Sequence, residues 1–232
     1  MQNALGTLEH ANLGEQVYDR IATALLNGQM RPNDKLTIRG LADQLGVSST
    51  PVRDAIKQLT QEQVLEQRSA KDVRVPVMTQ AAYLEILEIR LHLEGLAAER
   101  AAERATGEQR AMLRKLLERN DRAARSQNHV LATQGNQEFH LALSRFAEMP
   151  NLQRILKGLW LRMGPLVAGY YDTNPTGLND KHYEVLRAME MHDPATARVA
   201  LQEDISSAKD ALLSQITAFQ AKDTNVRRDD SL

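Results

Sequence analysis

The stretch that decides the fold is Leu41-Ala42-Asp43-Gln44-Leu45-Gly46-Val47-Ser48-Ser49-Thr50-Pro51-Val52-Arg53-Asp54-Ala55-Ile56-Lys57-Gln58-Leu59. Its first part has the apolar spacing of a short helix, which Gly46 ends as a left-handed C-terminal residue does. A second helix restarts almost at once, since Ser49 or Thr50 can cap it and Pro51 suits its first turn. Two short helices joined this tightly are typical of a helix-turn-helix.

The outer face of the second helix carries small polar and basic side chains. If Val52, Ile56 and Leu59 face the core, the remaining side chains lie at the helix tip or in solvent. Such groups can bond phosphates and base edges in a major groove. The residues expected to contact DNA here are Ser48, Ser49, Thr50, Arg53 and Lys57. The alternative is that they are solvated surface residues of an ordinary helical hairpin.

Two alternating segments, 64–68 and 73–77, follow the second helix. They predict a two-stranded ribbon joined by a tight loop, where Lys71 is a further DNA-contacting candidate. A helix-turn-helix followed directly by such a ribbon is a winged helix. The first helix of this domain is expected over 15–27, and Thr37 is expected to cap the next one.

Composition limits the classes of protein that fit. The chain has 232 residues, 42% of them apolar, which is enough for a packed core. The net charge of −1 argues against a general nucleic-acid binder but not against a sequence-specific one, whose basic residues need only cluster on one face. The absence of cysteine excludes disulfides and thiol catalysis. With no signal peptide and no apolar run of membrane-spanning length, a soluble cytoplasmic protein without membrane contact is expected.

The second half of the chain reads as helices only, so the expected fold is mostly α, an N-terminal winged helix-turn-helix plus a C-terminal all-α helical bundle. The expected helices are 80–104, 107–127, 129–147, 151–169, 178–191 and 195–219. The expected domains are a flexible arm (1–12), a winged helix DNA-binding domain (13–77), a helical effector-binding and dimerisation domain (79–219) and a disordered tail (220–232).

The helix expected over 80–104 is apolar on more than one face. One set contains Leu84, Leu87 and Leu91, and a second contains Ile86, Ile89, Leu93 and Leu96. A helix that is apolar so far round needs two partners, its own core and a second subunit. The sequence therefore predicts a homodimer.

The N-terminal motifs resemble the winged helix of the GntR family of bacterial transcription regulators. The residues that carry the resemblance are Arg31-Pro32 with Leu36, Leu41-Ala42, Leu45-Gly46-Val47-Ser48 and Thr50-Pro51-Val52-Arg53-Asp54-Ala55. The resemblance implies operator contacts by Arg39, by the polar helix tip and by Arg53. The chain departs from the family at Ser49, where an arginine is usual, and at the wing tip, where a glycine is usual.

The C-terminal motifs resemble the all-helical effector (FCD) domain of the FadR-type branch of that family. The residues that carry this resemblance are Ile89-Arg90 with Glu94, Ala97-Ala98, Phe139-His140 with Leu143, Met149-Pro150-Asn151, His182 with Leu186, and Asp193-Pro194 with Ala197. The resemblance implies a small organic-acid ligand, often bound through a metal held by one aspartate and three histidines. These ligands map onto Asn136, His140, His182 and Asp204, and two of the four positions depart from the family pattern.

Spacing alone also brings these four residues together. Asn136 and His140 lie one helical turn apart, and His182 and Asp204 are each eleven residues from Asp193, the expected turn of a helical hairpin. Such a mixed nitrogen and oxygen set suits zinc, nickel or manganese. The alternative is that both histidines are hydrogen-bonded core residues with Asp204 as a partner.

Further ligand-binding residues are expected at Arg90, Arg162 and Tyr170, beside Trp160 and Tyr171. Arg162 lies in an otherwise apolar helix and could clamp a carboxylate. The alternative is an arginine that pairs with an acidic neighbour or reaches solvent.

Three classes of function compete for this architecture. The first is a ligand-responsive dimeric transcription regulator, by family habit a repressor released from operator DNA by a small organic acid. The second is a metal-dependent hydrolase using the His/Asp cluster, although no His-Glu-x-x-His motif is present. The third is a helical scaffold protein whose winged helix binds protein.

Overall fold

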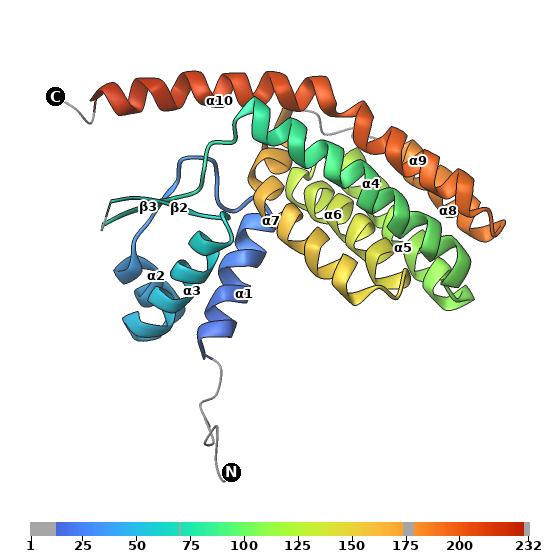
Figure 1. The fold of residues 1–232 in the computed structure, drawn as a ribbon, viewed down its shortest axis with the longest axis horizontal. Coiled ribbons are helices and arrows are strands. Elements are labelled where there is room, and N and C mark those ends of the chain that lie inside the picture. The colour runs from blue at the N-terminus through green and yellow to red at the C-terminus, as the bar shows by residue number, and fades with distance from the viewer. Residues whose placement is uncertain (1–12, 70, 174–178, 230–232) are drawn as a thin grey trace, which may run out of the picture.

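The computed structural model describes residues 13–69, 71–173 and 179–229. These residues form a small winged domain and a larger helical domain, which confirms the expected fold class (Figure 1). The arm expected over 1–12 lies outside the described residues. The elements are α1 (Leu13–Leu26), β1 (Lys35–Leu36), α2 (Ile38–Leu45), α3 (Ser49–Gln61), β2 (Glu66–Ser69), β3 (Asp72–Arg74), α4 (Gln80–Arg104), α5 (Gly107–Arg125), α6 (His129–Phe146), α7 (Pro150–Thr173), α8 (Asn179–Glu190), α9 (Pro194–Ser207) and α10 (Lys209–Asp229).

The helix-turn-helix forms as its sequence predicts, apart from one cap. The Thr37 side chain accepts a hydrogen bond from the Gly40 N–H, and Gly46 ends α2 with φ of +66°. Helix α3 begins at Ser49, so its N-cap is Ser48, which makes no side-chain capping bond. The expected capping by Ser49 or Thr50 is therefore wrong, because both residues already lie in the first turn.

The wing belongs to a three-stranded antiparallel sheet with the strand order β1-β3-β2. Leu36 of β1 and Gln67 of β2 both pair with Val73 of β3. The sequence predicts the ribbon but not β1, because a strand of two residues is too short to show alternation. Strand β3 ends at Arg74, earlier than the expected segment 73–77.

The helical domain contains an antiparallel hairpin, α8 and α9, that turns at Asp193. The Asp193 side chain caps α9 by accepting the Thr196 N–H, and Pro194 occupies the first turn. The single helix expected over 195–219 is broken at Ala208 into α9 and α10. At the break, the hydroxyls of Ser206 and Ser207 donate to the backbone carbonyls of Gln202 and Asp204. Such side-chain bonds compete with the backbone hydrogen bonds of the helix and favour a bend.

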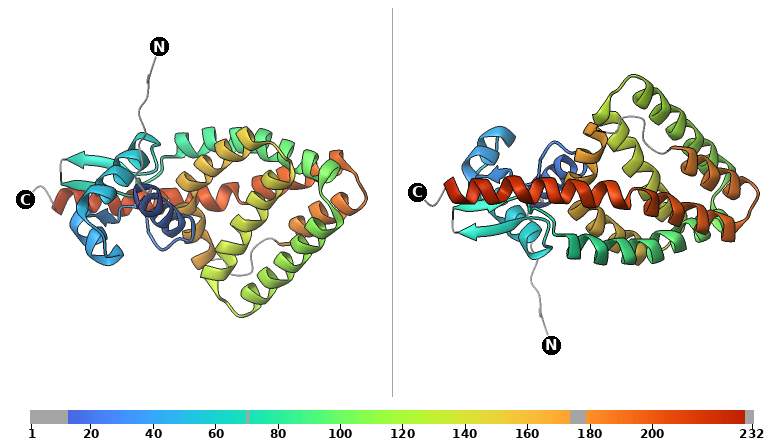
Figure 2. Two further views of the ribbon diagram at one scale, coloured as in Figure 1. Left: turned by 90° about the horizontal axis from the view of Figure 1, so that it is seen from below. Right: turned by 90° about the horizontal axis from the view of Figure 1, so that it is seen from above.

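Helix α10 crosses from the helical domain to the side of the wing (Figures 1 and 2). Gln80 donates to Thr217 at 3.0 Å, and Gln220 donates to the Met78 carbonyl at 3.5 Å, so α10 is tied to the interdomain linker. Residues 220–229 are helical, whereas a disordered tail was expected from residue 220 onward. None of the described helices is long and apolar enough to cross a membrane.

Helix α4 buries some of the apolar side chains from which a second subunit was predicted and leaves others in solvent. Leu87 is buried in the helical core and Leu91 packs partly buried against it. Leu84 and Ile89 remain 41% and 37% exposed. The apolar face open to a second subunit therefore excludes Leu87.

Helix α7 belongs to the cores of both domains. Trp160 and Met163 are buried among the helical-domain side chains, whereas Leu161 is buried among those of the winged domain. A side chain at Gly164 would lie 2.7 Å from the Leu25 carbonyl of α1, so the backbones of α1 and α7 are in direct contact there. The orientation of the winged domain is consequently set by one face of α7.

Candidate DNA interface and buried histidine cluster

The candidate DNA-contacting side chains gather at the tip and outer face of α3. Ser48, Ser49, Thr50, Arg53 and Lys57 are all exposed, and so is Arg39 in the first turn of α2. Among the described residues, Arg39, Arg53 and Lys57 have no ion-pair partner. Exposed, unpaired cations at a helix N-terminus are available for phosphates and guanine edges.

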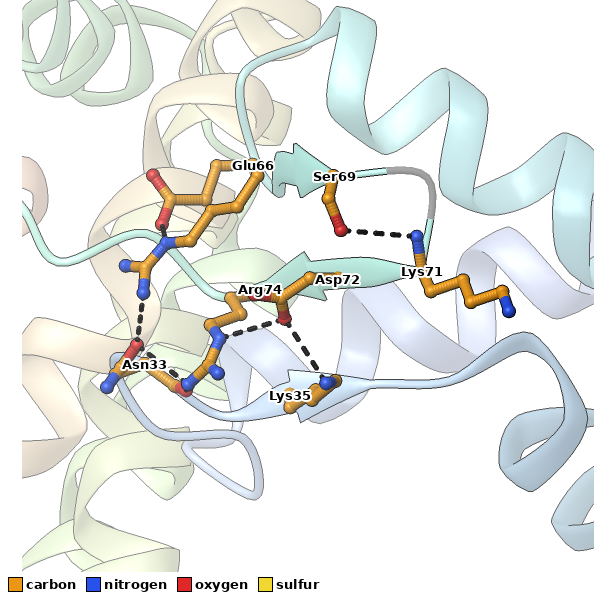
Figure 3. Close-up of polar contacts among 8 residues, drawn as sticks. Asn33, Lys35, Glu66, Ser69, Lys71, Asp72 and Arg74 are labelled. Atoms are coloured by element: carbon orange, nitrogen blue, oxygen red, sulfur yellow. Dashed lines mark hydrogen bonds and ion pairs between the residues drawn. The ribbon is translucent and has the colours of Figure 1, made fainter. Parts of the chain in front are cut away.

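The wing arginines, in contrast, are used inside the protein. Arg68 donates to Asn33 Oδ1 at 3.0 Å and also pairs with Glu66. Arg74 pairs with Asp72 at 2.9 Å and reaches the same Asn33 oxygen at 3.2 Å (Figure 3). Asn33 thus fixes the root of the wing, a role that the sequence analysis missed.

Lys71 is placed at the wing tip with its side chain directed away from this network (Figure 3). Its backbone N–H donates to Ser69 Oγ at 3.4 Å, which leaves the ammonium group without a partner among the described residues. The ammonium group of Lys71 is therefore open to an outside partner, while Arg68 and Arg74 hold the fold of the wing.

The cluster predicted from the hairpin spacing forms in the helical domain. Asp204 of α9 lies 3.3 Å from His182 Nε2 of α8 and 3.3 Å from His140 Nε2 of α6. One ligand atom from each of these three residues lies within 4.8 Å of the others, and all three side chains are buried. Burial raises the pKa of Asp204, but the two histidines outweigh it and hold that pKa below its usual range.

A glutamate that the sequence analysis used only as a mark of resemblance completes the cluster. Glu94 of α4 accepts from His140 Nδ1 at 2.6 Å and from Arg90 Nε at 2.5 Å. Burial raises the pKa of Glu94, yet Arg90 and His140 lower it to about 2. Burial lowers the pKa of His140, but Glu94 and Asp204 raise it above its usual value. Glu94 therefore stays ionised and orients the His140 ring.

His182 is the member of the cluster whose bonding is incomplete. Its ring is 1% exposed and stacks on Phe139 at 4.0 Å between centroids. Neither ring nitrogen has a hydrogen-bond partner among the described residues, and the 3.3 Å approach of Nε2 to Asp204 is an ion-pair contact only. A buried imidazole left in this state fits a residue that ligates a metal. Asn136, one turn before His140, lines the adjoining cavity, where its amide can complete the set.

The cavity beside the cluster is small and partly open to solvent, with a volume of about 40 Å³. Its walls are mainly aromatic and aliphatic. They include two buried polar atoms, Tyr83 Oη and Trp160 Nε1, that have no hydrogen bond to any described residue. Arg90 stacks on Trp160 at 4.3 Å. The cavity is lined by Tyr83, Arg90, Asn136, His140, Trp160, Val167, Tyr170, Tyr171, Asp204, Ile205, Ala208 and Leu212.

Two of the three predicted ligand-binding residues, Arg90 and Tyr170, line this cavity. Arg162 does not, because it projects from another side of α7 into a separate cavity at the junction of the two domains. Its position on an apolar helix could be read from the sequence, but the side of the helix it occupies could not.

The fold and these sites define a class, a DNA-binding regulator in which a winged helix is joined to an all-helical domain with an internal cavity. Residues 13–75 match "Bacterial regulatory proteins, gntR family" and residues 85–207 match the FCD domain. The chain belongs to the GntR family of transcription regulators, in the branch that carries the FCD domain.

Relatives across most of the chain agree with this assignment. The HTH-type transcriptional regulator McbR of Escherichia coli K12 is 32% identical over 202 residues, which are 85% of this chain and 91% of that protein. The solved structure of E. coli McbR/YncC superposes with a TM-score of 0.83 at 30% identity, covering 89% of this chain and 99% of that one. The probable D-xylose utilization operon transcriptional repressor of Paenarthrobacter nicotinovorans is 28% identical over 86% of this chain and 88% of its own.

The protein is thus a transcription regulator of the GntR/FCD type and not an enzyme. The hydrolase alternative gains no support from these relatives.

Proposed function

We propose that the protein is a homodimeric repressor that a small organic acid releases from its operator. The observation that carries the proposal is the position of α7, which lines the buried cavity with Trp160, Val167 and Tyr171 and places Leu161 in the core of the winged domain. A ligand that displaces this helix acts on both domains at once. The name of the Paenarthrobacter relative supports repression as the sign of control.

The DNA contacts proposed are those of a recognition helix in a major groove. Ser48, Ser49 and Thr50 present hydroxyls at the N-terminus of α3, where a phosphate or base edge is favoured. Arg53 and Lys57 lie one turn apart on the exposed face of α3. Arg39 and Lys71 add backbone contacts on either side, and a two-fold dimer would read a near-palindrome.

A divalent metal fits the cluster, held by His140, His182 and Asp204 with Asn136 as the fourth ligand. His140 has the outer carboxylate partner, Glu94, that orients metal-bound imidazoles, and His182 has unsatisfied nitrogens. Zinc, nickel and manganese all accept such ligands. When bound, the metal would supply open coordination positions for the carboxylate of the effector.

The dimer interface proposed involves α4 and α7, which pack against each other. Both helices keep apolar side chains in solvent, namely Leu84 and Ile89 on α4 and Ile155 on α7. Between them, Leu93 and Leu96 are only partly buried around a small cluster that includes Leu152. Exposed and half-buried apolar side chains on two packed helices are what a second subunit would cover.

The experiment that tests the function is operator binding by the full-length protein to DNA from upstream of its own gene. Titration of a panel of small organic acids should release the DNA from the unmodified protein. His182→Ala should bind the same DNA and resist release, while His129→Ala, a histidine outside the cluster, should behave as the unmodified protein. Absence of binding to that DNA, or equal release of the His182 variant, would refute the proposal.

The metal is tested separately by elemental analysis and melting. Binding to the folded state alone adds about 2.7 kcal/mol at a hundredfold excess over the dissociation constant, so a chelator should lower the melting temperature. His182→Ala should abolish that effect. Protein that contains no metal and melts identically with added zinc, nickel or manganese would refute the metal, and the same four side chains would then be tested as a direct hydrogen-bonding pocket for the acid.

A further inference from the structure

The cavity beside the histidine cluster contains two hydrogen-bond donors that the cluster does not use. Tyr83 and Trp160 are only 1% and 2% exposed, yet the Tyr83 hydroxyl and the Trp160 indole nitrogen have no hydrogen bond to any described residue. Both side chains line the cavity. Because buried polar groups in folded proteins are nearly always paired, two unpaired donors in one cavity indicate a partner that enters it.

The two donors require an acceptor atom from that partner. The indole N–H of Trp160 can donate a hydrogen bond but cannot accept one. Burial raises the pKa of Tyr83 to about 12, so its hydroxyl keeps its proton at neutral pH and is also available to donate. A methyl or methylene group at the same place would leave both donors unpaired, at a cost in affinity.

Trp160 holds its donor next to the residues that are proposed to bind the acid. Its ring lies 4.3 Å from the Arg90 guanidinium carbon and 5.0 Å, between centroids, from the His140 ring. Arg90 donates Nε to Glu94, and its two Nη groups make no hydrogen bond within residues 13–69, 71–173 and 179–229. A carboxylate on Arg90 or on the cluster therefore brings the rest of the same molecule close to Trp160.

The size of the cavity limits the ligand independently of its chemistry. A volume of about 40 Å³ has room for about three water molecules, since one water needs about 10–15 Å³. Three waters take up roughly 90 Å³ of liquid, which is about the volume of an acid with two or three carbon atoms. Sugars, aromatic acids and tricarboxylates exceed this space.

We propose that Tyr83 and Trp160 are specificity-determining residues, which make the cavity prefer a two- or three-carbon acid with a second oxygen over an aliphatic acid of the same size. Acids with a 2-hydroxy or 2-oxo group carry such an oxygen. Their carboxylate binds at Arg90 and the cluster, and the second oxygen accepts the hydrogen bonds that Tyr83 and Trp160 lack. This inference rests on the proposed function, because the acid is the effector of the same cavity.

Saturation-transfer NMR on the full chain without DNA measures the preference, with glycolate and propionate as the probes. The two acids have nearly the same shape, but glycolate has a hydroxyl where propionate has a methyl group. Glycolate should bind at least about tenfold more tightly, because propionate leaves buried donors unpaired. Citrate is too large for the cavity and should not displace glycolate.

Tyr83→Phe and Trp160→Phe test the two residues, since each variant removes one donor and keeps an aromatic ring. Each should weaken the binding of glycolate and leave that of propionate nearly unchanged, so that the ratio of the two affinities falls. A loss of packing alone would weaken both acids together and keep the ratio. Tyr183→Phe is the control, because the Tyr183 hydroxyl donates to Asp121 at 2.7 Å and does not line the cavity.

The proposal is overturned by equal affinities for glycolate and propionate, by displacement of glycolate by citrate, or by an unchanged ratio in both the Tyr83 and Trp160 variants. No binding of glycolate at millimolar concentration, with or without added zinc, would also overturn it.

Failure of the proposed function gives a different result. Glycolate that binds with the expected preference but leaves the operator bound would refute the effector response and leave the selection by Tyr83 and Trp160 intact. A larger acid that releases the operator, while glycolate does not bind, would support the effector response and refute this inference.

Discussion

Arg53 is an exposed side chain of the proposed DNA interface. It lies just after the first turn of α3 and has no ion-pair partner in the part of the chain that the structure describes, so its removal should affect binding and not folding. We expect Arg53→Ala to lose about 1–3 kcal/mol of operator binding at physiological salt, measured by fluorescence anisotropy. Arg154→Ala on α7 is the control and should bind normally. An unchanged affinity in folded Arg53→Ala protein would contradict the proposed interface.

Glu94, in contrast, is a side chain of the protein interior. It is ionised, fully buried, and shared by Arg90 and His140. Glu94→Gln leaves the Arg90 charge without its partner, and loss of one member of a buried ion pair costs about 3–5 kcal/mol of unfolding free energy.

Chemical denaturation measures the effect of Glu94→Gln. The control is Glu99→Gln on the same helix, whose pair with Arg198 is partly exposed and is worth at most about 1 kcal/mol. Similar losses in the two variants would show that the buried network contributes less than its geometry suggests.

For single residues, the sequence predicted the contacts that follow from spacing along the chain, but not the contacts that follow only from the packing of distant helices. His182 and Asp204 are equidistant from the turn at Asp193, so an antiparallel hairpin had to bring them level. The pairing of Glu94 with His140 joins α4 to α6 across forty-six positions, and no local pattern records it. Arg162 was recognised as unusual on an apolar helix, but its side of that helix follows from packing against α10 and the linker.

Among the elements, the close packing of α7 on α1 leads to the most specific prediction about stability. A methyl group at Gly164 would lie 2.7 Å from the Leu25 carbonyl and 3.0 Å from Leu26 Cα, both backbone atoms of α1. We expect Gly164→Ala to push the winged domain off α7 and to cost about 1–3 kcal/mol, as overpacking does.

Gly158 provides the matched control on the same helix, because a methyl group there meets nothing within 4 Å. Gly158→Ala should instead stabilise by about 0.5–1 kcal/mol through helix propensity. Thermal unfolding compares the two, and limited proteolysis of the linker near Met78 reports whether the domains separate. Equal stabilisation by both substitutions would show that α1 and α7 are not in close contact.

Element boundaries followed the sequence at some caps and not at others. Thr37 caps α2 as expected, and Asp193 caps α9 at the turn expected there, whereas α3 begins earlier than caps at Ser49 or Thr50 imply. Helix α5 begins with a complete capping box of Thr106 and Gln109. The break at Ala208 had no such mark, because serines back-bonding to the preceding turn look like ordinary helix residues. Strand β1 exists only because β3 pairs with it.

For the whole molecule, the burial of individual residues decides which of them can test the predicted dimer. Leu87 belongs to the apolar residues from which a second subunit was predicted, but it is 6% exposed in the core of its own domain. A charge there should unfold the chain. The residues that test assembly are those that α4 and α7 leave in solvent.

Ile89→Glu and Ile155→Glu therefore form the test of the dimer, since their side chains are 37% and 50% exposed and neither is needed for the core. In a two-fold interface each substitution places a charge on both sides of the contact, so both variants should be monomers at micromolar concentration in sedimentation equilibrium, with melting temperatures little changed. Operator affinity should fall with them, because one winged domain holds only half of a near-palindrome. Met112→Glu on α5, 52% exposed and away from α4 and α7, should remain a dimer. A stable monomer of the unmodified chain would rule out the dimer, and dimers of both isoleucine variants would place the interface elsewhere.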